Sequence, residues 1–270
     1  MSTIARALAL LDHFSPDHPR LGLTEMMRLS GRDKATVHRH LTALVQAGYL
    51  EQAPDTRAYR LGPALTRLAD MRRHTVPEIE MVGALIDDLS RVVGELVHVN
   101  RLHGFDLIHL CHAEHHNHPV RVSFDATERP PVLATASGRA FLAFSAPEVV
   151  AAALADPGTW DRKDAAPDGV AVRETLATIA AHGFAYNRDT LRLGVSSVAI
   201  PVFDADGTPV ATCSIAYPTG RGGADFRDRL ARHLMAFAPK MTVAMGGVVP
   251  ARVQKIWAAQ GNSTKMADQA

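Results

Sequence analysis

The sequence predicts an α+β fold divided into two domains, and three observations support this. Apolar residues recur at helical spacing through residues 3–46, whereas later stretches alternate as strands do. The chain has 270 residues, 47% of them hydrophobic, which is enough for two modest cores. The segment Thr75-Val76-Pro77 interrupts the pattern and marks a boundary. The expected parts are a first domain (1–62), a linker helix (63–76), a second domain (77–249) and a loose polar tail (250–270).

The first domain begins with three helices. Apolar spacing predicts one helix over residues 3–14 and a second that starts at Thr24, a suitable N-cap. Gly31 permits a tight turn, and residues 30–49 then form a third helix with an apolar stripe. The opposite face is short, small and basic, which suits the major groove of DNA. Two helices joined by a short turn, the second with such a face, indicate a helix-turn-helix.

A β-hairpin is expected directly after these helices. Residues 49–52 and 57–61 are short strand candidates on either side of the turn sequence Pro54-Asp55-Thr56. A hairpin in this position is a wing, and its arginines can contact phosphates or the minor groove. The DNA-binding candidates come from the third helix and the wing: Arg32, Lys34, Ala35, Thr36, His38, Arg39, Thr42, Arg57 and Arg60.

The remaining elements alternate between helices and strands. Pro63 is well placed in the first turn of the linker helix. The second domain is expected to contain helices over 78–93, 134–144, 147–155, 172–182 and 225–246. The expected strands cover 95–102, 107–112, 120–124, 195–203 and 209–217. Short turns join 95–102 to 107–112 and 195–203 to 209–217, so these pairs are expected to be antiparallel and to belong to an antiparallel sheet flanked by helices.

Charge and cysteine content narrow the class of protein. Residues 1–75 contain 11 lysines and arginines against 7 acidic residues, whereas the rest contains 18 against 21, so a nucleic-acid contact is expected at the N-terminal end. The two cysteines, Cys111 and Cys213, form no disulfide framework and suit a reducing cytoplasm. There is no signal peptide pattern and no apolar run of membrane-spanning length, so we expect a cytoplasmic protein without a membrane partner.

The chain resembles the IclR family of bacterial transcriptional regulators over roughly residues 4–248. In the first domain the resemblance rests on IARALALL (4–11), GRDKATVHRHL (31–41) and YRLG (59–62). In the second it rests on ATASGRAFLA (134–143) and GVSSVAIPVFD (194–204). It implies a winged helix-turn-helix joined to an effector-binding domain with a GAF/profilin-like fold. It also implies a homodimer or homotetramer that binds double-stranded operator DNA under the control of a small molecule.

The same resemblance implies where an effector would bind. Carried over by position, the contacts are Ala136, Ser137, Asn187, Val195, Ser197, Ser214 and Ala216. Backbone amides at a helix start favour an anion, and hydroxyls and a carboxamide orient a ligand in an apolar pocket. The family usually carries acidic residues between Gly183 and Gly194, where this chain has Asn187 and Thr190. Because negative charge is thereby removed, the expected effector is an organic acid.

One alternative function remains open, and it concerns metal binding. The segment 109–118 is rich in histidine, and the metal-ligand candidates are His109, Cys111, His112 and His116. A metal-responsive regulator or a metal-binding protein that uses this segment is therefore the alternative, although no defined ligand spacing is met. An enzyme is not expected, because no base or nucleophile elbow accompanies Ser137. No cofactor is expected either.

Overall fold

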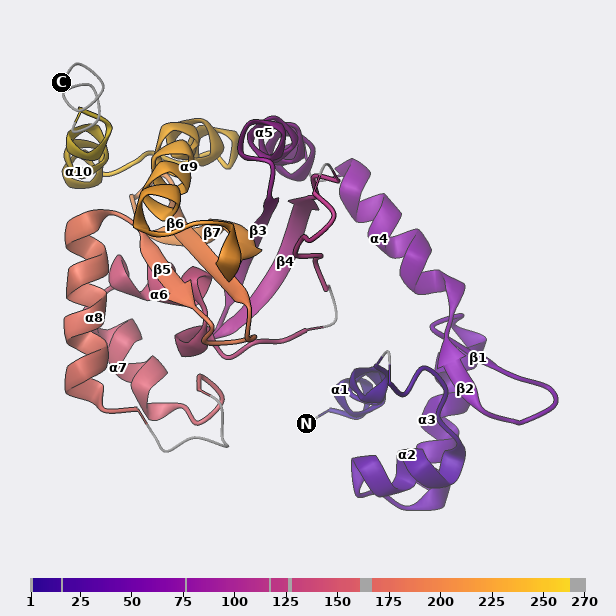
Figure 1. Cartoon of the computed structure of the whole chain (residues 1–270). Helices are drawn as coiled ribbons and strands as arrows, with labels where there is room; N and C mark the ends of the chain where they lie inside the picture. Colours follow the sequence, from indigo (N-terminus) through magenta and orange to yellow (C-terminus); the bar gives the residue numbers. More distant parts are fainter. Residues whose placement is uncertain are drawn as a thin grey trace. The chain divides into compact units, whose positions relative to one another are not determined.

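The computed structural model describes residues 2–15, 17–75, 77–116, 118–125, 128–160 and 167–262. The chain divides into two compact units, Met1–Pro77 and Glu78–Ala270 (Figure 1). Within those described ranges, no helix is long and apolar enough to cross a membrane.

The first unit is a helix-turn-helix followed by a hairpin. Its first helices are α1 (Thr3–Leu8), the short 3-10 helix η1 (Leu11–His13), α2 (Leu23–Ser30) and α3 (Lys34–Gln46). Gly31 ends α2 with a φ of 64°, which glycine adopts without strain. Asp33 caps α3, because its Oδ1 accepts the Thr36 backbone N–H at 2.9 Å. The core of this unit consists of Leu10, Leu21, Met26, Val37, Leu41, Leu44, Leu50 and Tyr59.

The predicted wing is confirmed. Strands β1 (Leu50–Gln52) and β2 (Tyr59–Leu61) pair antiparallel. Leu21 and Tyr59 exchange two backbone hydrogen bonds of 3.0 and 2.9 Å, which tie the hairpin to the segment before α2. A Cβ at Gly62 would lie 2.3 Å from the Gly48 carbonyl oxygen, so only glycine fits the base of the wing. Helix α4 (Pro63–Thr75) follows directly.

The second unit is built on one antiparallel sheet with the strand order β4-β3-β7-β6-β5. The strands are β3 (Leu96–His103), β4 (Asp106–Ala113), β5 (Ala185–Arg188), β6 (Val195–Phe203) and β7 (Pro209–Pro218). Val97 and Val99 lie opposite Ile215 and Cys213, so apolar residues share one face, while His98 between them points to the other face. The α+β fold with a helix-flanked antiparallel sheet is therefore confirmed.

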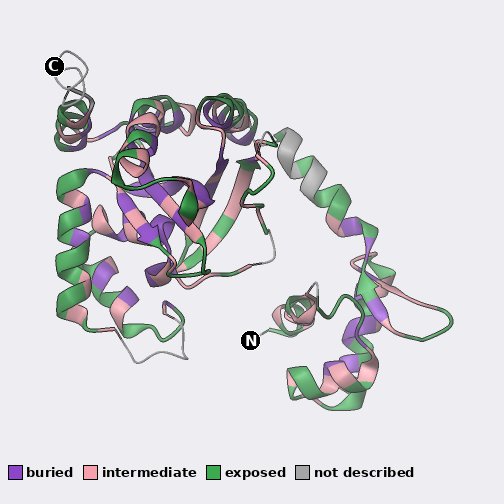
Figure 2. Ribbon diagram, in the orientation of Figure 1, coloured by how far each residue is buried: buried purple, intermediate pink, exposed green. Residues whose placement is uncertain are grey.

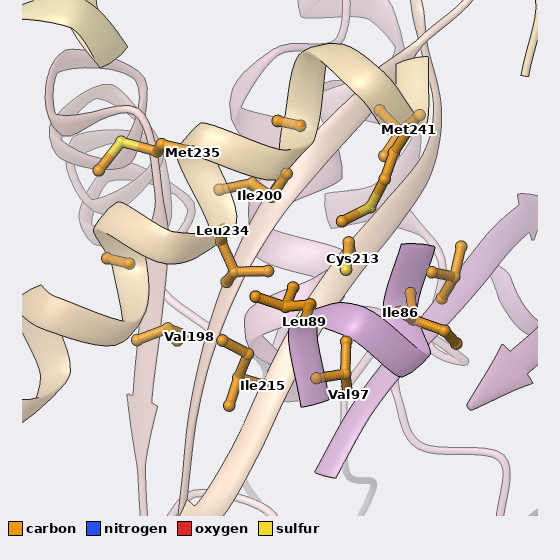
Figure 3. Packing of buried hydrophobic residues seen from close by; sticks show 14 of the residues in the cluster. Ile86, Leu89, Val97, Val198, Ile200, Cys213, Ile215, Leu234, Met235 and Met241 are labelled. Atoms are coloured by element: carbon orange, nitrogen blue, oxygen red, sulfur yellow. The ribbon is translucent and has the colours of Figure 1, made fainter. Parts of the chain in front are cut away.

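Each face of the sheet is covered by its own set of helices. Helices α5 (Pro77–Val93) and α9 (Ala224–Ala244) pack on the apolar face, where Leu89 and Leu234 lie against Ile215 and Cys213 (Figure 3). The other face carries η2 (Val132–Ala134), α6 (Ala136–Ala143), α7 (Pro147–Ala155) and α8 (Gly169–His182). Figure 2 shows that burial is concentrated on the sheet and on the inward sides of these helices.

The prediction of a loose tail after residue 250 is wrong for the part that is described. Residues Ala251–Asn262 form helix α10, whose side chains Val253 and Trp257 belong to the main core. The indole Nε1 of Trp257 donates to the Gly183 carbonyl at 2.8 Å. Two side chains on one edge suffice to anchor this helix, which explains why the sequence has no broad apolar stripe. Residues 263–270 lie outside the described ranges.

Four smaller expectations also need correction. The first predicted helix breaks at residues 9–10 and continues as η1, and α2 is capped by Gly22 instead of Thr24. Residues 120–124 form no strand, because Phe124 donates its backbone N–H to the Glu114 side chain at 2.8 Å instead of joining the sheet. Strand β5, not predicted, forms the sheet edge next to β6.

Candidate functional site

The outer face of α3 is a small basic surface in the first unit. Lys34, Ala35, His38 and Arg39 are exposed, and Thr36 and Thr42 are partly exposed beside them. The inward face is fixed by burial of Val37, His40, Leu41 and Leu44. Burial and the neighbouring cationic side chains of Arg39, Arg32 and Arg6 lower the pKa of His40, so this ring is neutral and packed as part of the core.

The three remaining candidate arginines have different local roles. Arg32 donates through Nη1 to the Arg6 carbonyl at 2.6 Å, which links α1 to the turn before α3. Arg60 pairs with Glu51 across the wing, with Nη2–Oε2 at 2.7 Å. Arg57 lies exposed in the wing loop with a φ of 58°. The Arg60 pair is exposed and contributes less than about 1 kcal/mol, so phosphate can replace Glu51 as its partner.

A cavity of about 380 Å³ lies in the second unit, on the sheet face that α6 also covers. Its wall combines strands β3, β4, β5, β6 and β7, the start of α6, and the segments 122–125, 128–130 and 190–192. All seven residues expected to contact an effector line it: Ala136, Ser137, Asn187, Val195, Ser197, Ser214 and Ala216. The structure thus gathers residues that are up to 80 positions apart in the sequence.

The start of α6 forms one end of this cavity. Thr135 caps the helix by accepting the Gly138 backbone N–H at 2.9 Å, and the helical ladder begins with Arg139 N–H to the Thr135 carbonyl. The first amides of a helix have no partner within the helix, so those of Ala136 and Ser137 can serve a ligand. The Ser137 and Ser214 hydroxyls lie 2.6 Å apart, both buried. Amides at a helix start and hydroxyls are groups that can donate to an anion.

Asn187 positions the cavity wall through both ends of its carboxamide. Nδ2 donates to the Ala134 carbonyl at 2.7 Å, and Oδ1 accepts from Arg139 Nη1 at 3.1 Å. Arg139 Nε in turn donates to the Leu133 carbonyl at 2.7 Å. Burial lowers the pKa of the Arg139 guanidinium, whose charge therefore lies in a poorly solvated place behind the wall. The asparagine thus locks β5 to the segment that leads into α6.

Charged side chains line another part of the cavity wall. Arg192 contacts Glu128 at 3.1 Å and Asp125 at 3.5 Å, which links the 190–192 loop to the segments 122–125 and 128–130. Arg129 and Asp106 also line the cavity.

The sequence prediction missed the wall formed by β3 and β4. His98 and Asn100 of β3 and His109 of β4 line the cavity together with Phe124. His98 lies directly opposite Ser214, so it is next to the hydroxyl pair of Ser137 and Ser214. The alternation of His98 and Asn100 with Val97 and Val99 was the available signal, since these polar residues occupy every second position of a strand.

Comparison with known proteins identifies the family. The family model described as "Bacterial transcriptional regulator IclR C-terminal" matches residues 74–243, and the one described as "IclR helix-turn-helix domain" matches residues 3–54. The chain belongs to the IclR family. Helix α3 and the cavity described above therefore lie in the helix-turn-helix and C-terminal domains of an IclR-type regulator.

Individual IclR relatives cover most of the chain. BhcR of Paracoccus denitrificans, an HTH-type transcriptional regulator, is 31% identical over 219 residues, or 80% of this chain and 77% of that protein. XynR of Escherichia coli is 27% identical over 238 residues, with coverages of 85% and 93%. A chain from Silicibacter sp. TM1040, described as an IclR transcriptional regulator, has 34% identity and a TM-score of 0.80 over 93% of this chain and 99% of its own.

One further structure similar to this IclR chain contains a ligand. It is an IclR homolog from Microbacterium hydrocarbonoxydans complexed with 4-hydroxybenzoate. Its identity is 24%, its TM-score is 0.72, and the match covers 90% of this chain and 99% of that one. At this identity the likeness establishes the shared fold.

Two histidines of the histidine-rich segment, His109 and His112, form an aromatic cluster with Phe124. The register of β3 and β4 shifts after Val99, so His109 and His112 share a face, while Cys111 packs toward the main core. Burial raises the pKa of the Cys111 thiol to about 12. Among the described residues, no three His, Cys, Asp or Glu side chains are placed to hold a metal ion, which leaves the candidates His109, Cys111, His112 and His116 without support.

Proposed function

We propose that this IclR-family chain binds operator DNA through the outer face of α3 and the wing, and that an organic acid in the cavity controls this binding. The protein would act as a homodimer or homotetramer in the cytoplasm, by binding and not by catalysis. Ser137 fits that role, because its hydroxyl is bonded to the Ser214 hydroxyl and not to a general base.

The DNA contact is supported by the exposed face of α3. Arg39 is exposed at the middle of the helix and can reach base edges, while Lys34 and His38 flank it. Thr36 and Ala35 are small enough to let the helix approach thymine methyls and phosphates. Arg57 and Arg60 of the wing extend the positive charge toward the backbone.

The observation that carries the effector proposal is the buried polar end of the cavity. Two helix-start amides and the paired hydroxyls of Ser137 and Ser214 converge there, inside a cavity large enough for a small molecule. Buried donors left without a partner cost free energy, so a ligand with acceptor oxygens is favoured. An organic acid has such oxygens, and the ligand of the Microbacterium hydrocarbonoxydans structure is one example.

The DNA half of the proposal is tested by selecting duplexes from a random library and measuring affinity by fluorescence anisotropy. Phosphate contacts release counterions, so the dissociation constant should rise steeply with salt concentration. Arg39→Ala should abolish specific binding, whereas Arg173→Ala, which removes an exposed arginine from α8, should leave it unchanged. Equal loss in both variants, or none in either, would refute the assigned surface. Light scattering of the free and bound protein tests the oligomeric state.

The effector half is tested by a thermal-shift screen of organic acids. A ligand that binds the folded state raises the melting temperature. The screen should return acids whose effect is lost in Ser137→Val, a variant that blocks the hydroxyl pair without adding charge. If no acid shifts the wild type, the effector proposal fails while the DNA proposal stands.

A further inference from the structure

Four aromatic rings form a cluster at the part of the cavity wall that β3, β4 and Phe124 provide. Phe124 lies at its centre, with ring centroids 4.1 Å from His109, 4.7 Å from His112 and 5.5 Å from His98. The rings of Phe124 and His112 are stacked, with 18° between their planes. Of these rings, His98, His109 and Phe124 line the cavity. The cluster therefore supplies three ring surfaces to the cavity wall.

His98 and His109 of this cluster are uncharged at neutral pH. Burial lowers the pKa of His98 to about 4, and the nearby His109 and His112 make smaller contributions in the same direction. Burial and His112 lower the pKa of His109 to about 4 as well. A neutral imidazole carries a single N–H and one lone pair, so the position of that proton decides whether the ring donates or accepts.

In His98 the surroundings select the proton's position. Its Nδ1 is buried and has no hydrogen-bond partner in the part of the chain that the structure describes. A buried N–H without an acceptor costs more free energy than a buried lone pair without a donor. The proton of the neutral ring therefore belongs on Nε2. Nε2 is then the nitrogen through which His98 can meet a ligand in the cavity. His98 presents a donor beside Ser214, its cross-strand neighbour in the hydroxyl pair with Ser137.

His109 contributes differently. Its Nε2 lies 3.1 Å from Nδ1 of His112, and its Nδ1 is sealed without a partner among the described residues. Neither nitrogen is therefore left for a ligand, and what His109 offers the cavity is its ring. His109 lies opposite Asn100, two residues along β3 from His98, so this ring surface lies farther along the wall than the donor. Phe124 continues the same surface.

We propose that His98, His109 and Phe124 form a recognition wall for an aromatic carboxylic acid. His98 donates from Nε2 to the carboxylate, together with the α6 amides and Ser214, and the aromatic ring packs against His109 and Phe124. This assignment rests on the proposed effector function and specifies its ligand class. An aliphatic acid of equal size can use the donors and bury the same area, but it lacks the additional contribution of an aromatic pair.

The test compares two probes of the same charge and similar size, benzoate and cyclohexanecarboxylate, by isothermal titration of the full-length protein. Aromatic contacts contribute about 0.5–1.5 kcal/mol, so the wild type should bind benzoate about threefold to tenfold more tightly. His98→Leu should weaken both acids about tenfold and keep their ratio, since it removes the shared donor. His109→Leu should reduce the ratio toward one, and His109→Phe should restore it.

His103→Leu is the matched control, because His103 is an exposed residue of β3 outside the cavity wall. It should bind both acids as the wild type does. Equal affinity of the wild type for the two acids, or unchanged affinity in His98→Leu, would overturn the recognition wall and leave the effector proposal intact. If neither acid binds the wild type while other organic acids do, the aromatic class is wrong. If no organic acid binds, both proposals fail.

Discussion

Replacing Asn187 by aspartate should weaken the binding of organic acids to the cavity. The change is nearly isosteric, but it places a carboxylate in the wall that the proposed ligand anion faces. It also exchanges the Nδ2 donor, now 2.7 Å from the Ala134 carbonyl, for an oxygen. Two oxygens at that distance repel each other, so the segment leading into α6 should shift. The Arg139 contact at 3.1 Å is retained and strengthened.

The size of the effect follows from charge and distance. A carboxylate about 7 Å from the ligand anion, at an effective dielectric constant of about 20, raises the free energy of binding by about 2 kcal/mol. That corresponds to a roughly thirtyfold increase in the dissociation constant. Arg139 neutralises part of the new charge, so the expected range is about fivefold to thirtyfold.

Isothermal titration with benzoate measures the change, and Thr190→Asp provides the comparison. Thr190 also lines the cavity but is exposed, so solvent screens a charge there and the affinity should fall less than about threefold. Tighter binding of acids to Asn187→Asp than to the wild type would refute the reasoning. Equal losses in the two variants would show that the buried position of Asn187 has no special role.

Three further changes test separate parts of the account. Arg39→Ala should abolish operator binding in anisotropy measurements yet leave acid binding intact; loss of both would mean that Arg39 supports the fold. Trp257→Ala removes a core indole and its 2.8 Å hydrogen bond to Gly183, and should lower the free energy of unfolding in urea by about 3–5 kcal/mol. A loss below about 1 kcal/mol would mean that α10 is not part of the core. The pKa of His98 is about 4 in the folded chain against about 6.5 unfolded, so the unfolded chain binds more protons and stability falls as pH decreases from about 6.5 toward 4. This ring should remove about 1 kcal/mol between pH 7.5 and pH 5.5, and His98→Gln should lessen the drop; an unchanged pH profile would contradict neutral burial of His98.

Elements with strong local signals could be predicted from the sequence. The stripe of α3, the glycine turn before it and the hairpin after it are each encoded within a few neighbouring residues, so the winged helix-turn-helix was predicted correctly. The seven cavity residues came from the family resemblance, and the structure places all of them in one wall. No local pattern relates Ser137 to Ser214, because their contact depends on how α6 packs on β7.

The missed features depend on tertiary structure. On a regular strand His109 and His112 would face opposite sides, and only the register shift after Val99 brings them to one face. Helix α10 is held by Trp257 and its contact with Gly183, a residue 74 positions earlier in the chain. The bond of Arg32 to the Arg6 carbonyl joins residues 26 positions apart, so no local pattern indicates it.

The central claim is that an acid bound in the cavity controls operator binding, and one measurement on the full-length protein tests it directly. Fluorescence anisotropy of a selected operator duplex is recorded with the full-length wild type and with Ser137→Val, each with and without saturating benzoate. If an acid in the cavity controls operator binding, benzoate should change the operator dissociation constant of the wild type by about fivefold or more and leave that of Ser137→Val unchanged. If acids bind the wild type but none of them changes its dissociation constant for the operator, the claim that the cavity controls the DNA-binding unit is contradicted.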